Sequence, residues 1–555
     1  MPNTPASDRS NQPALLQEYL RGADAAMRAG DQARAMQLGE EAARRGLEHP
    51  NLLVLAGYRA LDRGVADDAL ALLQRARELA PRNVDVLNAL GLALARLSRQ
   101  REAVAVYDAA LRQSPATPML HYNKACALED LSELTRARNE FERTLELQPA
   151  HAESLTHLAT IAALRGDGNA ARDFATRALR HNPGLVAAAL ALAMADIEEK
   201  KLDAALVRLK PLMGAANVSG LNRSIAQGLA GDALDGLGRP SEAFLAYTAS
   251  NATMRELVKP IYERPGAERA PERVERLTAY FRAADPQQWR ARQDKAIESP
   301  VRTHVFLVGF PRSGTTLLEQ VLASHPDIET MEERDCLLDG IDEFVVPPDG
   351  LARLATADES DLARLRKAYW TRAREAGYAP RRAIFVDKMP LNTVVLCLIA
   401  KLFPQAKILF ALRDPRDCVL SCFRRRFAMS PQMYELLTLE GAGRYYAAVM
   451  RLGEIYRDKL ALDTLALRYE DMVADFEGET RRVCDFLGVD WREEMRAFAE
   501  KTRARDVNTP SAAQVARGLF SSGAGQWRHY RRELAPVLPE LAPWIARFGY
   551  LQDEE

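Results

Sequence analysis

The stretch Val305 to Gln320, VFLVGFPRSGTTLLEQ, decides the fold of the C-terminal half of the chain. It begins with an apolar run of β type, continues through a glycine turn and ends with apolar residues at helical spacing. This order predicts a strand, a phosphate loop and a helix. In such a turn, backbone N–H groups and the positive end of the helix converge on a tetrahedral anion, and glycines let the chain come close.

The position of the cation in this turn distinguishes it from a Walker A loop. Gly309 and Gly314 have the spacing of a Walker A loop, but Thr315 stands where that loop carries lysine, and Arg312 is the strong cation. An ordinary nucleoside triphosphatase uses that lysine on the β- and γ-phosphates. The substitution disfavours a P-loop kinase, which would need Mg²⁺ and ATP. The plainer alternative is a tight turn with no ligand.

A second phosphate-binding site is predicted about a hundred residues after this loop. The apolar run Ile408 to Leu412 is followed by Arg413, and Ser421 lies in the helical segment beyond it. Ligands bind at the C-terminal ends of strands in open α/β sheets, and a guanidinium with a hydroxyl near a helix start suits a phosphate. Without a phosphate loop in the same domain, an arginine that follows a strand is more often part of a surface ion pair.

The turn residues resemble the 5′-phosphosulfate loop of the sulfotransferases, and the following SHPD (324–327) and MEER (331–334) resemble the tyrosylprotein sulfotransferase branch. The resemblance implies 3′-phosphoadenosine 5′-phosphosulfate as the donor. It assigns the donor's 3′-phosphate to Arg413 and Ser421, a donor contact to Tyr469 in RYED (468–471), and contact with the transferring group to Ser522. The implied 5′-phosphosulfate loop consists of Pro311, Arg312, Ser313, Gly314, Thr315 and Thr316.

The same resemblance implies the catalytic residues. Glu333 aligns with the glutamate that serves as base, and Lys388 aligns with the lysine assigned to the sulfonate and the bridging oxygen, work that Arg312 would share. The acceptor hydroxyl loses a proton as sulfur is attacked, and the leaving oxygen gains charge. Glu332 and Asp335 are rival bases. His325, before a proline at a helix end, is expected to cap or pack, and no metal is expected.

Two positions depart from the family's pattern. Asp335 stands where the animal tyrosylprotein enzymes have an arginine that binds acidic peptides, and Arg517 is displaced by one residue from an arginine of related bacterial chains. Protein tyrosine is the first acceptor hypothesis, because the region around Glu333 matches that branch. A small-molecule, glycan or lipid hydroxyl is the alternative, and a repeat scaffold with an inactive nucleotide-binding domain is a hypothesis of another class.

The N-terminal half carries an internal repeat. Four prolines recur every 34 residues, which is the tetratricopeptide period, and small residues recur before each of them. These prolines are Pro81, Pro115, Pro149 and Pro183. We expect six or seven helical pairs stacked as a right-handed solenoid, whose groove suits an acceptor peptide or partner protein. An architectural arm or a homodimerisation surface is the alternative.

After the repeats, the pattern changes from helical to alternating. Residues 254–300 read as a helical connector, and β-runs separated by helices follow, as in a doubly wound sheet. The predicted β-runs are Val305 to Val308, Ile384 to Val386, Ile408 to Leu412 and Leu465 to Arg468. The predicted fold is therefore a disordered N-terminus (1–15), an all-α tetratricopeptide solenoid (16–253), the connector, and an α/β P-loop-like sulfotransferase domain with a parallel sheet (301–555).

Composition excludes several classes of protein. The 555 residues carry 75 Lys plus Arg against 76 Asp plus Glu, so no global basic field calls for nucleic acid. The six cysteines lack CxxC pairs and nearby histidines, which favours reduced thiols over disulfides or zinc. The N-terminal segment is polar and the longest apolar run is too short for a bilayer. These features predict a cytoplasmic protein with no membrane span.

Overall fold

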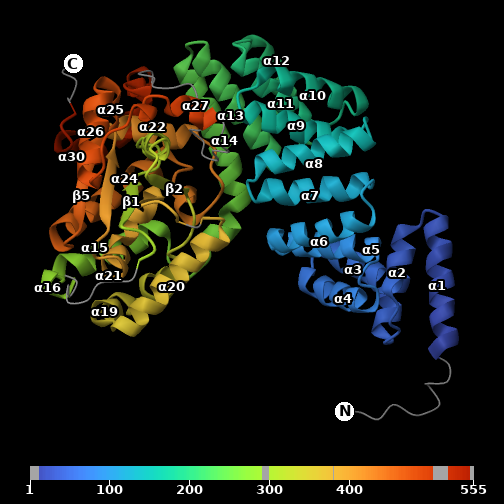
Figure 1. The fold of residues 1–555 in the computed structure, drawn as a ribbon. Coiled ribbons are helices and arrows are strands. Elements are labelled where there is room, and N and C mark those ends of the chain that lie inside the picture. The colour runs from blue at the N-terminus through green and yellow to red at the C-terminus, as the bar shows by residue number, and fades with distance from the viewer. Residues whose placement is uncertain (1–11, 290–298, 379, 504–522, 551–555) are drawn as a thin grey trace. The chain divides into compact units, whose positions relative to one another are not determined.

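The computed structural model describes the chain except residues 1–11, 290–298, 379, 504–522 and 551–555. The chain divides into two compact units, residues 1–195 and 196–555. Figure 1 shows helices alone in the first unit and a sheet surrounded by helices in the second. These architectures confirm the predicted fold class, helical repeats followed by an α/β domain.

The first unit is a succession of antiparallel helices joined by short turns. They are α1 (Gln12–Arg28), α2 (Gln32–Arg44), α3 (Pro50–Asp62), α4 (Ala66–Leu79), α5 (Val84–Arg96), α6 (Gln100–Gln113), α7 (Pro118–Asp130), α8 (Leu134–Leu147), α9 (Ala152–Leu164) and α10 (Gly168–His181); α11 (Val186–Glu198) crosses the boundary. Small residues let the helices approach: a Cβ at Gly91 would meet the Tyr107 ring at 2.5 Å. The buried alanines and leucines of α3 to α9 form one continuous core, and smaller clusters lie before and after it.

The turns inside the helical pairs share one backbone conformation. In each of them one residue is left-handed, with φ between 58° and 77°. These residues are Gly30, Gly64, Ser98, Ser132, Gly166, Lys200 and Gly238. The first six are 34 residues apart, so the repeat period also appears in the backbone. Only glycine adopts this conformation without a steric penalty, so Ser98, Ser132 and Lys200 each carry a cost that the glycines do not.

The second unit begins with helices and continues as a parallel sheet. The leading helices are α12 (Leu202–Gly214), α13 (Gly220–Gly236), α14 (Pro240–Tyr262), α15 (Ala270–Ala283) and α16 (Pro286–Trp289). The strands are β1 (Thr303–Gly309), β2 (Ile328–Glu332), β3 (Ile384–Lys388), β4 (Lys407–Leu412) and β5 (Asp463–Arg468), in the order β2-β3-β1-β4-β5. Four of them were predicted, whereas the edge strand β2 was not.

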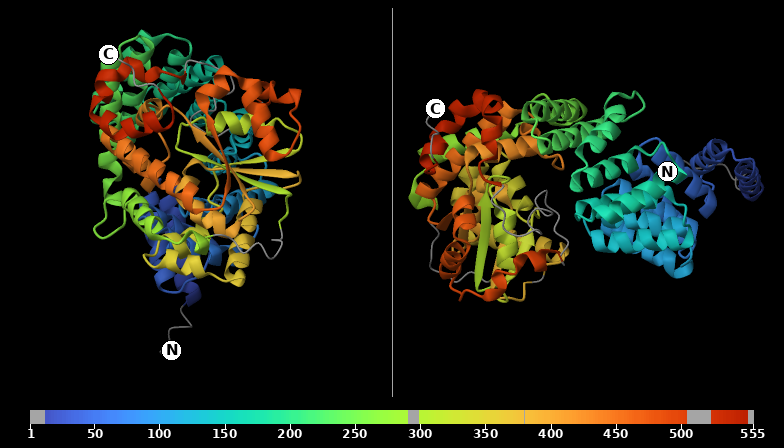
Figure 2. Two further views of the ribbon diagram at one scale, coloured as in Figure 1. Left: turned by 90° about the vertical axis from the view of Figure 1, so that its left-hand side faces the viewer. Right: turned by 90° about the horizontal axis from the view of Figure 1, so that it is seen from above.

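Helices cover both faces of this sheet (Figure 2). They include α17 (Thr315–Ala323), α20 (Glu359–Glu375), α21 (Leu396–Leu402), α22 (Pro415–Arg424), α24 (Leu439–Lys459), α25 (Tyr469–Ala474), α26 (Phe476–Leu487) and α30 (Leu538–Arg547). Side chains of β1 alternate between two cores: Val305 and Leu307 pack with α17 and α26, whereas Phe306 and Val308 pack with α21 and α24. Both faces are apolar, as a parallel sheet requires.

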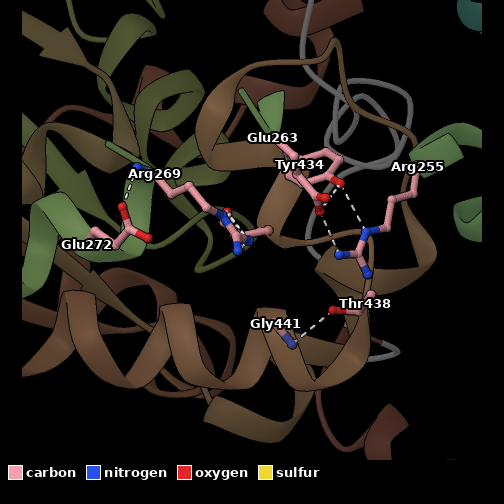
Figure 3. A network of polar contacts seen from close by, with 8 residues as sticks. Arg255, Glu263, Arg269, Glu272, Tyr434, Thr438 and Gly441 are labelled. Atoms are coloured by element: carbon pink, nitrogen blue, oxygen red, sulfur yellow. Dashed lines mark hydrogen bonds and ion pairs between the residues drawn. The ribbon is translucent and has the colours of Figure 1, made fainter. Parts of the chain in front are cut away.

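The helices α14 and α15 pack directly on the α/β part of the second unit. Arg269, which precedes α15, binds Glu435 of α23 (Pro431–Glu435) through both of its carboxylate oxygens, at 2.7 and 2.8 Å. Beside this pair, the Tyr434 hydroxyl bonds Glu263 at 2.6 Å, and Arg255 contacts both of these side chains (Figure 3). A single core contains Tyr247 of α14, Phe281 of α15 and the face of the sheet that carries Phe306 and Val308. Residues 196–300 are thus structurally part of this unit.

Two further expectations concern cysteines and membranes. All six cysteines are free thiols, five of them buried. Across the described ranges, no helix is both long and apolar enough to cross a membrane. In the same part of the chain, no group of three or more His, Cys, Asp or Glu side chains is placed to hold a metal ion.

Candidate active site

The phosphate loop connects β1 to α17 and depends on its glycines. Gly309 and Gly314 have φ of 154° and 96°, outside the comfortable range of other residues. A Cβ at Gly309 would meet the Ala411 carbonyl oxygen at 2.5 Å, and one at Gly314 would meet the Tyr469 ring at 2.9 Å. Arg312 between them is also left-handed, with φ of 71°. This conformation has a steric cost for a non-glycine residue, so the contacts of the loop must hold Arg312 in it.

Arg312 lies in a concentration of positive charge. Its Nε donates to the Ser421 hydroxyl of α22 at 2.9 Å. Burial, together with the guanidiniums of Arg425 and Arg413, lowers the pKa of Arg312 to about 9. Clustered guanidiniums repel one another unless an anion joins them, so the site suits a multiply charged phosphate ligand.

Arg413 follows β4 and is held beneath the loop. Its guanidinium donates to the carbonyl oxygens of Arg312 at 2.9 Å and Gly523 at 2.5 Å, and it stacks 5.2 Å from the centre of the Tyr469 ring. The side chain is buried, and its Nε–H has no acceptor among the described residues. A buried N–H without an acceptor is costly, and a bound phosphate oxygen would satisfy it.

Buried thiols and a hydroxyl support the loop from behind. The thiols of Cys418 and Cys422 in α22 contact the Pro311 carbonyl oxygen at 3.6 and 3.3 Å. Burial raises the pKa of both thiols, so they remain protonated donors. The Thr393 hydroxyl accepts from the Gly309 amide at 3.0 Å and contacts its carbonyl oxygen at 2.8 Å. These contacts hold the backbone of the loop at Gly309 and Pro311.

Two strand ends bring Glu333 and Lys388 together. Glu333 follows β2, Lys388 ends β3, and the Glu333 amide donates to the Lys388 carbonyl oxygen at 2.9 Å. Lys388 Nζ donates to Glu333 Oε1 at 2.8 Å. Burial by itself lowers the pKa of Lys388, but Glu319, Glu333 and Glu332 together raise it. The lysine is 0% exposed, whereas the Glu333 side chain is 43% exposed and faces the cavity.

A cavity of about 410 Å³ joins most of the predicted donor and catalytic residues. Its lining includes Pro311, Arg312, Gly314, Thr315, Thr316, Glu333, Arg413, Ser421 and Tyr469. Ser313 is buried. Ser522 and Arg517 lie outside the described residues. His325 is also buried, where its ring nitrogens bond the Asp490 carbonyl oxygen and the Asp327 amide, so it packs as expected.

Two family models match separate parts of the chain. The sequence model described as the sulfotransferase family matches residues 304–493. These residues form a sulfotransferase-family domain. The tetratricopeptide repeat model matches residues 54–118 and 122–186. The sulfotransferase domain thus contains the phosphate loop, the Glu333–Lys388 pair, Arg413 and Ser421.

The sulfotransferase domain is similar to proteins from several organisms. A protein-tyrosine sulfotransferase A of Caenorhabditis elegans is 23% identical over 44% of this chain and 67% of its own length. An uncharacterized protein of Aquifex aeolicus is 27% identical over 46% of this chain. This chain spans only 34% of the Aquifex protein. The solved sulfotransferase domain of the Synechococcus PCC 7002 olefin synthase is 24% identical over 47% of this chain and 100% of that one, with a TM-score of 0.35.

Residues before the sulfotransferase domain complete the wall of its cavity. The end of α11, the turn after it and α13 contribute Ile197, Lys200, Asp232, Asp235 and Gly236. Asp235 binds Arg424 of α22 at 2.5 Å and also accepts from the Tyr530 hydroxyl. The sequence did not predict these contacts, because the acidic residues of α13 form no motif and only packing brings them to the cavity.

The segment after residue 522 closes another side of the cavity. Asp417 in the first turn of α22 accepts from the Gly525 amide at 2.6 Å and the Trp527 amide at 2.8 Å. The Arg416 guanidinium stacks 3.6 Å from the centre of the Trp527 ring. A Cβ at Gly523 would meet the Tyr469 hydroxyl at 2.7 Å. The helix α22, which carries Ser421, therefore also fixes residues 523–527, the segment whose Gly523 carbonyl oxygen accepts from Arg413.

Proposed function

We propose that this chain transfers a sulfonate group from 3′-phosphoadenosine 5′-phosphosulfate to an acceptor hydroxyl, with protein tyrosine as the first acceptor. One observation carries the proposal: a glycine phosphate loop, a second arginine–serine pair and a carboxylate–ammonium pair line or border a single cavity. The sulfotransferase-family match and the tyrosylprotein relatives support the same assignment.

The donor has two anionic ends, and the cavity has two groups of donors for them. The amides that start α17 and the Arg312 side chain suit the 5′-phosphosulfate. Arg413, with its unsatisfied buried Nε–H, and Ser421 suit the 3′-phosphate. Thr315 in the position of the Walker lysine leaves ATP without its usual cation.

The roles of the remaining residues follow from the chemistry of an in-line transfer. The acceptor oxygen forms a bond to sulfur, the bond between sulfur and the bridging oxygen breaks, and its electron pair leaves with the 5′-phosphate. Glu333 accepts the hydroxyl proton, because its carboxylate faces the cavity. Lys388 and Arg312 stabilise the charge on the leaving oxygen, and positioning supplies much of the rate. The donor supplies the sulfonate, and the step uses no metal.

The tetratricopeptide repeats provide the proposed means of acceptor selection. Such repeats usually bind peptides or partner proteins on an extended surface. We therefore assign the acceptor protein or peptide to them as a partner. A small-molecule, glycan or lipid hydroxyl is the second candidate, because Asp335 replaces the arginine that the acidic-peptide enzymes carry.

Radioactive transfer from ³⁵S-labelled donor to a tyrosine peptide, compared with a phenol and an aliphatic alcohol, tests this proposal. Glu333→Gln should abolish transfer while leaving donor affinity unchanged, because the base does not hold the phosphates. Asp335→Asn is the matched control, since this neighbouring carboxylate should be dispensable. Full activity of Glu333→Gln would contradict the assignment of the base, and loss of transfer in Asp335→Asn alone would move that role to Asp335.

A further inference from the structure

A third carboxylate lies behind the Glu333–Lys388 pair. Glu319 belongs to α17 and is 1% exposed. Its Oε1 accepts from the Thr330 hydroxyl of β2 at 3.1 Å. Its Oε2 lies 3.7 Å from Lys388 Nζ and has no hydrogen-bond partner among the described residues. The carboxylate is thus anchored through one oxygen and directed at the lysine with the other.

Burial makes this arrangement necessary for a charged lysine. An ammonium group removed from water loses its proton unless nearby negative charge compensates it. Lys388 is 0% exposed and has Glu333 at 2.8 Å and Glu319 at 3.7 Å. Glu332 of β2 contributes at longer range. Asp387, the preceding residue in β3, accepts a hydrogen bond from the Tyr369 hydroxyl through Oδ2 at 2.8 Å.

The proposed reaction removes one of these partners. When Glu333 accepts the proton of the acceptor hydroxyl, it becomes neutral and no longer compensates Lys388. At that moment, charge develops on the leaving oxygen and the ammonium is most needed. Glu319 is 1% exposed and does not belong to the lining of the 410 Å³ cavity, so the acceptor hydroxyl does not reach it during this step.

We propose that Glu319 is a positioning residue that acts as the permanent buried counter-ion of Lys388, keeping it protonated and in place while Glu333 serves as the base. This inference rests on the proposed function for the role of Glu333. The relation between Glu319 and Lys388 is a property of the folded chain and can be measured without any acceptor. Glu319 was not a predicted site residue, because a single glutamate in a helix carries no motif.

The ¹³Cε chemical shift of Lys388 in the full chain, assigned with Lys388→Arg, reports its charge. Glu333→Gln is a neutral isostere of the protonated base. In this variant Lys388 should remain charged between pH 6 and 9.5, and in Glu319→Gln/Glu333→Gln it should titrate within that interval. Glu332→Gln/Glu333→Gln is the matched control and should keep the lysine charged. A charged lysine in the first double variant, or a neutral one in Glu333→Gln alone, would overturn the proposal.

A second variant guards against failure of the double variant to fold. Thr330→Val removes the anchor of Glu319 and keeps its charge. The double variant Thr330→Val/Glu333→Gln should have a lower titration midpoint of Lys388 than Glu333→Gln alone. This decrease should be smaller than the decrease in Glu319→Gln/Glu333→Gln. No change would refute the anchored geometry.

Turnover supplies a readout that a merely structural role would not move. Glu319→Gln should lower kcat at least tenfold at pH 8 and shift the alkaline limb of the pH profile to lower pH, with donor affinity little changed. Glu319→Asp should restore part of kcat. An unshifted alkaline limb of the pH profile would refute the role of Glu319 in turnover. Absence of transfer in the wild-type chain would refute the proposed function, and the chemical shift of Lys388 would still test whether Glu319 is its counter-ion.

Discussion

Replacing Thr393 with valine tests whether one buried hydroxyl holds the phosphate loop. Thr393 is 0% exposed and lies in the 3₁₀ turn η2 (Pro390–Val395). Its hydroxyl accepts from the Gly309 amide at 3.0 Å and lies 2.8 Å from the Gly309 carbonyl oxygen. Valine keeps the shape and removes both interactions. A buried N–H left without an acceptor costs about 1–3 kcal/mol, so we expect the loop to lose about 2 kcal/mol of local stability.

This loss has two measurable consequences. The Gly309 amide should exchange its hydrogen about 30-fold faster, since 1.4 kcal/mol corresponds to a factor of ten. Affinity for adenosine 3′,5′-bisphosphate should fall about tenfold, because part of the binding energy must restore the loop. Thr393→Ser retains the hydroxyl and is the matched control. If the valine and serine variants exchange and bind alike, the hydroxyl does not hold the loop.

Three further substitutions test separate parts of the structure. Lys200→Gly should raise the free energy of unfolding by up to about 1 kcal/mol in denaturant titration, because it relieves a left-handed lysine; a destabilised variant would contradict this. Gly231→Ala should lower that free energy by about 1–3 kcal/mol, since its Cβ would meet the Tyr247 ring at 2.5 Å; an unchanged value would refute the packing. Burial raises the pKa of Asp387 to about 7 and lowers the pKa of His304 to about 3. From about pH 4 to 6.5, Asp387 therefore makes the free energy of unfolding fall as the pH rises, whereas His304 makes it increase. Asp387→Asn should therefore lose more stability than the wild type on acidification from pH 7 to 4, and parallel pH curves would refute these opposed contributions.

The phosphate loop and the repeats were predictable because local chemistry specifies them. A glycine turn between an apolar strand and a helix is a local sequence pattern, and Arg413 stands directly after its strand, where the sheet brings it to the loop. The 34-residue period likewise fixes the spacing of small residues that helix pairs require. In these places, the sequence pattern and the tertiary structure agree.

Other parts depend on packing that no local pattern reveals. The edge strand β2 contains Ile328, Thr330 and Met331 between charged residues, so its alternation is too short and too polar to stand out. The apolar segment after β3 divides into η2 and α21, and the Thr393 side chain within it is turned to the Gly309 backbone. Glu319 lies in α17, whose first eight residues are all buried, so no polar face marks it as unusual.

The cavity wall formed by residues before the sulfotransferase domain was not predicted. Lys200 and the acidic residues of α13 belong to sequence that reads as ordinary repeat helices. Their place in the cavity wall follows from the packing of α14 on α22, with a bond from the Asn251 side-chain amide to the Phe423 carbonyl oxygen at 2.8 Å, and from the Asp235–Arg424 ion pair. A contact of this kind joins residues that are 172 positions apart, which no short motif encodes.

Calorimetric titration of the full chain with adenosine 3′,5′-bisphosphate, beside ATP with Mg²⁺, tests the central claim most directly. The bisphosphate carries both anionic ends without the transferable group, so it probes the loop and Arg413 together. We expect micromolar or tighter binding of the bisphosphate, no comparable binding of ATP, and loss of binding by about 2–5 kcal/mol in Arg413→Ala. Binding of ATP with Mg²⁺ but not of the bisphosphate would contradict the sulfotransferase account and favour a kinase.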